Sequence, residues 1–520
     1  MAYDFGMVGA PERPRSTFDL SHMTTFDAQE GNLYPVCALD CIAGDVFQIS
    51  EEVVIRAYNP PITSILQNIR AKIWYFFVPY RILDDNFEEF ITGGIDGKAT
   101  PTLDRWTPTN AGLYSLWDYF GFPIDVIPSG AYAPLAFPRT AYNFIWNEYF
   151  RDESVDDEID LENESVLRVR WSKDYFTSAL LSPQRGNPLA LPINLSNDLR
   201  LGVSTSSPVP AGSNFPFGLG FVDTIVDPTL VDFNDGAYHG AKLTQGSANN
   251  NTSATLYLHS LSLDGGINAT SFDANDMRYV FAAQRFMELS NRAGNRYVEF
   301  LQAHFAVSPT DARLQRPEFI GMCSAPIIVS EVLQNSESAE GNPLGKIGGH
   351  AISATTGDIG SYRCEEPGII LGLMTIVPDA MYHQGIHRSW LKQTRYDWML
   401  PEFVNTGEQE IKQEEIYAEN GTGNNGQTFG FQGRYDEYRY MASNVKGAIR
   451  PGQSLDFWTQ CRHFDSAPGL NAAFLECNPD RRVFTVTDET QTDWVVSIGH
   501  NIMAVRPLPM VAVPGLIDHD

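Results

Sequence analysis

The chain is short of cysteine, of positive charge and of long apolar runs. Six cysteines are spread through 520 residues, which is too few for a disulfide scaffold. Cys37 and Cys41 have no neighbouring histidine that would complete a zinc site, so we expect buried, reduced thiols. The longest apolar run, residues 369–377, is about half the length that a membrane-spanning helix requires. No stretch near the start combines basic residues with an apolar core, which predicts a soluble protein without an export signal or membrane insertion.

The charge is one-sided, because 36 lysines and arginines stand against 64 aspartates and glutamates, a formal net charge of −28. A protein that binds nucleic acid by itself shows a basic footprint, and this chain as a whole shows none. The excess of carboxylates favours a repulsive outer surface that keeps the chain in solution. If the chain encloses DNA, cations or a separate basic partner must neutralise most of the phosphate charge.

Turn-forming residues interrupt nearly every segment, since the chain contains 42 glycines and 32 prolines. This composition predicts a mainly β protein of many strands and long loops. The predicted strands lie far apart in the sequence, which is typical of a jelly roll with long insertions and not of alternating strands and helices. They cover residues 45–55, 69–78, 368–377, 454–461, 482–487 and 493–505.

Two helices are predicted in the middle of the chain. Residues 276–289 have Asn275 or Asp276 available as N-cap, and Gly294 ends the helical pattern. Residues 296–305 then continue it with apolar side chains at four-residue spacing. The apolar face of the first helix consists of Met277, Val280, Ala283 and Met287.

Two other stretches read as surface segments. Residues 196–272 alternate small polar residues with short apolar pieces, which predicts a surface excursion with hairpins of its own. Residues 152–164 carry eight carboxylates, which predicts an exposed acidic loop.

Two motifs resemble enzyme or metal sites, but the residues around each motif do not fit that chemistry. Residues 421–426 have the glycine spacing of a dinucleotide site, but no helix start follows them. His383 and His387 have the spacing of a helical zinc pair, but Gly385 lies between them and no catalytic glutamate accompanies them. We therefore expect no catalytic residue, no metal and no cofactor. Paired carboxylates for glycosidase chemistry are left open, because their separation is a three-dimensional quantity.

One local cluster combines cations with aromatic rings, a combination that suits stacking and phosphate contact with single-stranded nucleic acid. Asp436 and Glu437 lie within the same segment, so ion pairs inside the chain are the alternative interpretation. The candidate contact residues for DNA or a basic protein are Arg434, Tyr438, Arg439, Lys446 and Arg450.

The end of the sequence is unusually apolar, with a proline-broken run over residues 506–514. Exposed apolar surface costs roughly 25 cal/mol per Å². We therefore expect Pro514, Leu516 and Ile517 to dock on the core or on a neighbouring copy, as a candidate subunit interface.

Several blocks of the sequence are characteristic when they are taken together. The most specific block runs from Asp311 to Gly321 and is preceded by Arg296 to Glu299. The other blocks are residues 18–22, 24–27, 76–83, 146–151, 175–178, 183–186, 382–386, 401–403, 407–409, 438–440 and 514–519. In this collinear order the blocks resemble the major capsid proteins of the Microviridae, small phages with single-stranded DNA, in the gokushovirus branch.

This resemblance implies an eight-stranded antiparallel jelly roll with a few helices, one domain over residues 1–520, that assembles into a T = 1 icosahedral shell around circular single-stranded DNA. It also implies a small, very basic DNA-binding protein as a partner. Residues 1–44 would form an N-terminal arm and residues 273–306 a helical insertion. Residues 198–272 match, by position, an insertion that forms protrusions at the threefold axes. Its candidate host-facing residues are Thr244, Asn249, Asn250 and Asn251.

We therefore expect a structural protein of the virion that associates with itself and is assembled in the bacterial cytoplasm. Host attachment, including contact with a surface glycan, would fall to residues 198–272. The alternative function is a carbohydrate-binding or carbohydrate-active β protein, given the acidic and aromatic-rich composition. A jelly roll that forms filaments or open tubes also fits the sequence.

Overall fold

The computed structural model describes residues 14–187, 274–333, 347–421, 423–488 and 491–511, and five short strands between residues 200 and 264. The chain divides into two compact units, Met1–Asn187 with Phe286–Asp520 and Pro188–Arg285. None of the helices in the described ranges is long and apolar enough to cross a membrane.

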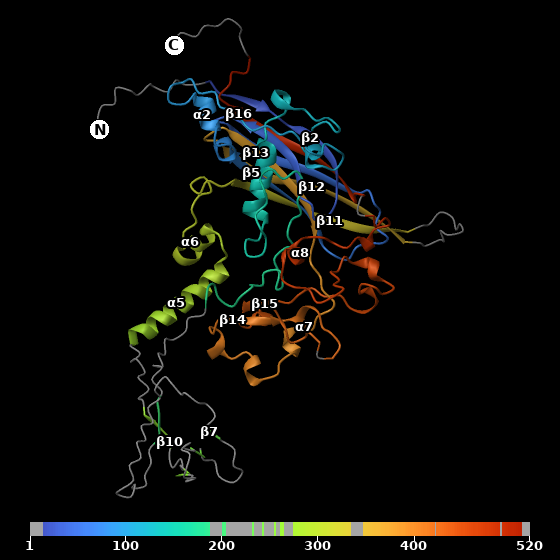
Figure 1. Cartoon of the computed structure of the whole chain (residues 1–520). Helices are drawn as coiled ribbons and strands as arrows, with labels where there is room; N and C mark the ends of the chain where they lie inside the picture. The colour runs from blue at the N-terminus through green and yellow to red at the C-terminus, as the bar shows by residue number, and fades with distance from the viewer. Residues whose placement is uncertain are drawn as a thin grey trace. The chain divides into compact units, whose positions relative to one another are not determined.

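The larger unit is built on one curled antiparallel sheet (Figure 1). The order of its strands is β1-β16-β4-β12-β11-β5-β13-β3, and β2 pairs with β16 beside β1. β1 and β2 lie one after the other along β16, so they act as one strand position. The strands are β1 (Ser16–Asp19), β2 (His22–Ala28), β3 (Tyr34–Cys41), β4 (Val46–Ala57), β5 (Ile69–Pro79), β11 (Glu318–Leu333), β12 (Ile347–Arg363), β13 (Gly368–Pro378) and β16 (Trp494–Arg506).

The connections between these eight positions are those of a jelly roll. One layer contains β1 with β2, β16, β4 and β12, and the other contains β3, β13, β5 and β11. When the eight positions are numbered along the chain, the first layer holds positions one, eight, three and six, and the second holds two, seven, four and five. The long pair β11–β12 joins the layers along one side. This topology of two interlocked Greek keys confirms the predicted eight-stranded jelly roll. Residues 16–41, within the range 1–44 that the sequence assigns to an N-terminal arm, supply β1, β2 and β3 of this sheet.

The main core fills the space between the two layers, and a second core covers the outer face of one of them. β13 is buried along its whole length because it contacts both cores, as its largely apolar sequence predicts. Trp106, Trp117 and Trp146 belong to the insertion between β5 and β11 and form the second core. Helix α4 (Phe137–Ile145), teal in Figure 1, packs against β13 from this side. The other short helices of this insertion are α1 (Tyr80–Leu83), α2 (Phe87–Thr92) and α3 (Leu116–Tyr119).

The second long insertion, residues 379–493, connects β13 to β16 and contains a third apolar cluster. It holds the hairpin of β14 (Glu408–Lys412) and β15 (Thr428–Gly433), with α7 (Gln413–Ile416) and α8 (Ala472–Leu475). The predicted strands at 454–461 and 482–487 are wrong, because these segments contain single 3₁₀ turns. Val483 and Phe484 nevertheless reach the main core, which explains their strand-like apolar pattern.

The two predicted helices are present as α5 (Ala274–Ala293) and α6 (Tyr297–Phe305). Gly294 separates them with a φ of +106°, a value in the left-handed region that favours glycine. The Glu299 carboxylate accepts the backbone N–H of Arg296 at 3.0 Å and thereby caps α6. In the smaller unit, β6 (Arg200–Val203) pairs with β10 (Leu261–Asp264), and β8 (Lys242–Leu243) pairs with both β7 (Val231–Asp232) and β9 (Ala254–Thr255).

The six cysteines are free thiols, and all except Cys323 are buried. Burial raises the pKa of Cys37 and of Cys461 to about 12. These thiols are therefore protonated near neutral pH and unreactive, as the sparse and scattered cysteines predict.

Candidate nucleic-acid interface

The candidate basic residues fall into two groups in the insertion between β13 and β16. Arg434 stacks over the Tyr435 ring at 5.0 Å and donates to the Tyr396 carbonyl at 3.0 Å. Arg439 forms an ion pair with Asp436, so for this residue the alternative interpretation from the sequence is confirmed.

The structure adds a neighbouring segment that the sequence reading missed. The Lys392 ammonium lies 4.3 Å from the ring centre of Trp398 and 4.6 Å from that of Tyr438. Arg395 stacks over Tyr396 at 4.8 Å. Trp390 and Trp398 are 82% and 60% exposed. Residues 388–398 alternate cations with aromatic residues, and this pattern could have identified them.

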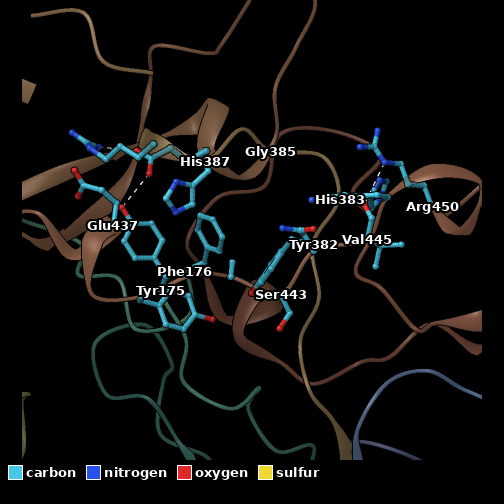
Figure 2. Close-up of a pocket in the computed structure, with 16 residues that line it drawn as sticks. Tyr175, Phe176, Tyr382, His383, Gly385, His387, Glu437, Ser443, Val445 and Arg450 are labelled. Atoms are coloured by element: carbon cyan, nitrogen blue, oxygen red, sulfur yellow. Dashed lines mark hydrogen bonds and ion pairs between the residues drawn. The ribbon is translucent and has the colours of Figure 1, made fainter. Parts of the chain in front are cut away.

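The second group, Lys446 and Arg450, lines a cavity of about 180 Å³ (Figure 2). Tyr175 and Phe176 enter this cavity from the insertion between β5 and β11, and the Tyr382 ring lies beside that of Phe176, with 4.9 Å between the ring centres. Lys446 and Arg450 are exposed at its edge, and neither forms an ion pair with a described residue. The cavity therefore places two free cations beside a wall of aromatic rings.

The histidine pair of the sequence is not one site. His383 stacks on His463, with 3.2 Å between its Nε2 and the Nδ1 of His463, whereas His387 caps the following turn. Burial, together with nearby His463 and Arg450, lowers the pKa of His383 to about 4. His383 is therefore neutral near pH 7, and the positive charge at this side of the cavity comes from the lysine and the arginines.

The other end of the cavity is closed by a buried polar group. Arg388 forms an ion pair with Glu415 at 2.7 Å, and the Tyr175 hydroxyl donates to the same carboxylate at 3.0 Å. Burial raises the pKa of Glu415 in spite of these partners. These three residues satisfy one another, so they fix the shape of the cavity and leave ligand contact to its open edge.

The remaining candidate residues lie outside the described part of the chain. These residues are Pro514, Leu516 and Ile517 of the candidate interface, and Thr244, Asn249, Asn250 and Asn251 of the candidate host-facing surface. The acidic segment at residues 152–164 is only partly the exposed loop that we expected. Its Asp152, Glu153 and Asp156 form ion pairs with cations of the surrounding structure.

Comparison with known proteins agrees with the fold. The family model described as "Capsid protein (F protein)" matches residues 7–516. The capsid protein VP1 of Chlamydia phage 1 is 31% identical over 591 residues, covering 96% of each chain. VP1 of Bdellovibrio phage phiMH2K is 31% identical over 98% of this chain and 97% of its own, and VP1 of Spiroplasma virus 4 is 28% identical over 99% and 97%. A jelly roll matched over almost its whole length by these proteins belongs to the F-protein family, the major capsid proteins of the Microviridae.

Proposed function

We propose that this chain is the repeating subunit of a T = 1 icosahedral shell that encloses circular single-stranded DNA. The observation that carries the proposal is that a folded jelly roll leaves large apolar side chains in water. Ile95, Ile127 and Tyr132, all in the insertion between β5 and β11, are more than half exposed. Association with another copy is favourable when it buries such apolar surface. Obligate interfaces typically bury more than ~2,000 Å².

The mass of the assembled particles tests the closed shell against tubes and filaments. A T = 1 shell contains sixty copies, so chains of 57.9 kDa would give an empty particle of about 3.5 MDa. We expect one sharp sedimenting species of this mass. A broad distribution without a fixed mass would mean an open assembly.

The apolar end of the chain is proposed as part of these subunit contacts. Pro514, Leu516 and Ile517 combine a rigid proline with two large apolar side chains, which suits docking against a neighbouring copy. We propose that the shell assembles in the bacterial cytoplasm together with a small basic protein, which would offset the formal charge of −28.

For DNA contact we propose the exposed cations beside aromatic rings, namely Lys392 with Arg395 and Lys446 with Arg450. Exposed rings stack on unpaired bases, and the cations contact phosphates. Arg434, Tyr438 and Arg439 frame this surface, with Arg439 partly neutralised by Asp436.

Neutralising either pair of cations should weaken DNA binding and its dependence on salt. Each lost phosphate contact lowers the slope of log affinity against log salt by ~0.7 for single strands, so we expect a fall of about 1.4 for Lys446→Ser with Arg450→Ser. The measurement is oligothymidine binding to the unassembled chain at several salt concentrations. Lys98→Ser with Arg313→Ser, which removes two exposed cations elsewhere, is the matched control. An equal loss in the control would contradict the proposed contact.

Host attachment is proposed for residues 198–272, whose many short polar segments suit a variable surface. Deleting residues 244–253, which include Thr244, Asn249, Asn250 and Asn251, should leave particles intact and reduce adsorption to host cells about tenfold or more. Particle yield by sedimentation and adsorption counts separate the two effects. Unchanged adsorption by intact particles would assign attachment to another surface.

A further inference from the structure

A second cavity lies on the outer face of the layer that contains β5 and β13. Its volume is about 520 Å³, which is within the usual range for small-molecule sites. Lys72 and Trp74 of β5 and Thr375 and Val377 of β13 form one wall. The opposite walls come from residues 149–154, 169–173, 178–180 and 291–299.

This wall interrupts an otherwise apolar sheet face. On β13, Leu371, Leu373 and Val377 point to this side and pack into the second core. Thr375 occupies the next position of the same row, and its cross-strand neighbour is Lys72. The hydroxyl of a buried threonine on a covered sheet face costs free energy unless it has a polar partner.

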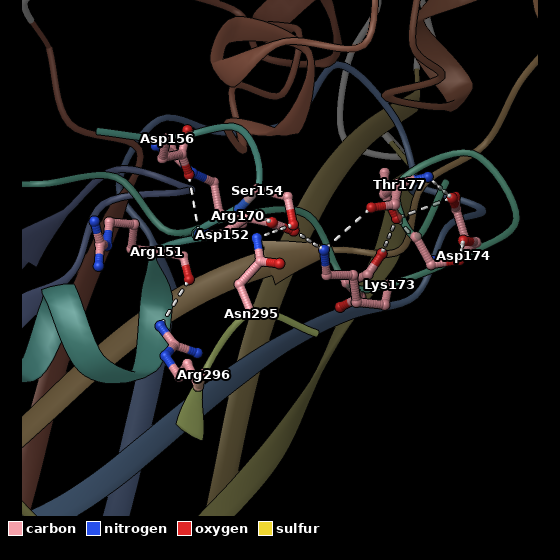
Figure 3. A network of polar contacts seen from close by, with 12 residues as sticks. Arg151, Asp152, Ser154, Asp156, Arg170, Lys173, Asp174, Thr177, Asn295 and Arg296 are labelled. Carbon is pink, nitrogen blue, oxygen red and sulfur yellow. Dashed lines mark hydrogen bonds and ion pairs between the residues drawn. The ribbon is translucent and has the colours of Figure 1, made fainter. Parts of the chain in front are cut away.

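Polar contacts link many of the groups around the cavity (Figure 3). The Arg170 guanidinium is 2.7 Å from Asp156, the Arg296 guanidinium is 3.1 Å from Glu153, and Lys173 pairs with Asp152. Asn295 donates to the Ser154 hydroxyl at 2.9 Å. Two further cations of the lining, Arg151 and Arg292, also form ion pairs. These five cations therefore have their counter-charges.

Lys72 and Thr375 differ from this surrounding network. The Lys72 ammonium reaches the Ser172 hydroxyl at 3.4 Å and forms no ion pair with a carboxylate of the described residues. The Thr375 side chain is 1% exposed, and its hydroxyl has no hydrogen-bond partner in the described structure. An ammonium without a carboxylate partner, next to a buried hydroxyl without a hydrogen-bond partner, is an arrangement that an anion completes.

We infer that this cavity binds a phosphate group, held by the Lys72 ammonium and the hydroxyls of Thr375 and Ser172. Lysine contacts phosphate as a compact point charge, and hydroxyl groups supply the neutral donors. The half-buried Trp74 ring, in edge contact with Phe150 at 5.1 Å, offers an apolar surface for a base attached to that phosphate. The phosphate belongs either to a free mononucleotide or to a nucleotide of a polynucleotide chain.

Calorimetric titration of the unassembled full chain with inorganic phosphate, deoxyadenosine monophosphate and oligothymidine tests the inference. We expect Lys72→Met and Thr375→Val each to lower the affinity for the bound ligand about tenfold or more, because each removes one direct contact. The matched control is Lys98→Met, which removes an exposed lysine elsewhere. Thermal unfolding of all variants verifies that the fold is kept.

The ligand that binds identifies the source of the phosphate. If the mononucleotide binds and both substitutions weaken its binding, the cavity is a small-molecule site. If the two substitutions weaken only the binding of oligothymidine, the phosphate belongs to a polynucleotide. Lys446→Ser with Arg450→Ser leaves this cavity intact, so it separates the present inference from the proposed DNA surface. The inference is overturned if none of the three ligands binds, or if Lys72→Met binds as tightly as Lys98→Met.

Discussion

Glu51→Ala is expected to destabilise the jelly roll by about 3 kcal/mol or more, because it leaves buried hydrogen-bonding groups without a partner and opens a cavity. The Glu51 carboxylate lies between the two layers, 2.8 Å from the Nδ1 of His500, and accepts the Tyr75 hydroxyl at 2.5 Å. All three side chains are fully buried. Without the carboxylate, the phenol and the imidazole lose a strong acceptor, and a cavity remains in a core that water does not enter.

Urea unfolding of the unassembled chain, followed by tryptophan fluorescence, measures this effect. Glu52→Ala is the matched control, because Glu52 is the next residue on β4 and faces outward. We expect this control to change stability by less than about 0.5 kcal/mol. Glu51→Gln keeps an acceptor for Tyr75 and should lie between the two. Equal unfolding midpoints for Glu51→Ala and Glu52→Ala would contradict the structural role of Glu51.

A second large effect is expected from Glu30 and depends on pH. Glu30 is buried, where it accepts the Trp494 indole N–H at 3.2 Å and the amide of Gln460. Burial raises the pKa of its carboxyl to about 8, and the neighbouring Asp493 adds to the increase. Between pH 4.5 and 8 the folded chain therefore holds a proton that the unfolded chain releases. The contribution of Glu30 to the free energy of unfolding therefore falls as the pH rises through this window and is constant on either side of it.

Replacing the carboxyl with an amide should remove this dependence. Glu30→Gln is uncharged at every pH, so it should unfold at higher urea concentration than the wild type above pH 8. The difference should reach about 3–5 kcal/mol, at 1.36 kcal/mol for each pH unit of the window. Unfolding midpoints of both chains at pH 5, 7 and 9 measure it, because the other titrating groups cancel between the two. Parallel pH profiles would contradict a buried, protonated Glu30.

Strands that contact apolar neighbours on both faces could be predicted from the sequence. β5 and β13 read as core strands because β5 ends, and β13 begins, with an apolar run, residues 73–79 and 368–374. β11 and β12 were missed, because β12 alternates small and polar residues and its outward face stays exposed. The segments near Trp458 and Phe484 were mistaken for strands, since a side chain that reaches the core from a turn has the same apolar pattern.

The candidate site was only partly predictable, because its residues converge from distant segments. Lys392 and Tyr438 are 46 residues apart in the sequence and meet in one cation–ring contact. Arg439 was proposed for ligand contact, but Asp436 on the preceding turn neutralises it. Lys72 and Thr375 gave no local signal, since their pairing depends on the register between β5 and β13.

Electron microscopy of the expressed chain, alone and with phage genes co-expressed, tests whether it forms a closed shell. We expect uniform icosahedral particles with knobs at the threefold axes, in which each copy covers the exposed apolar loops of another. A stable monomer under both conditions would contradict the claim that this jelly roll functions by closing a shell around DNA.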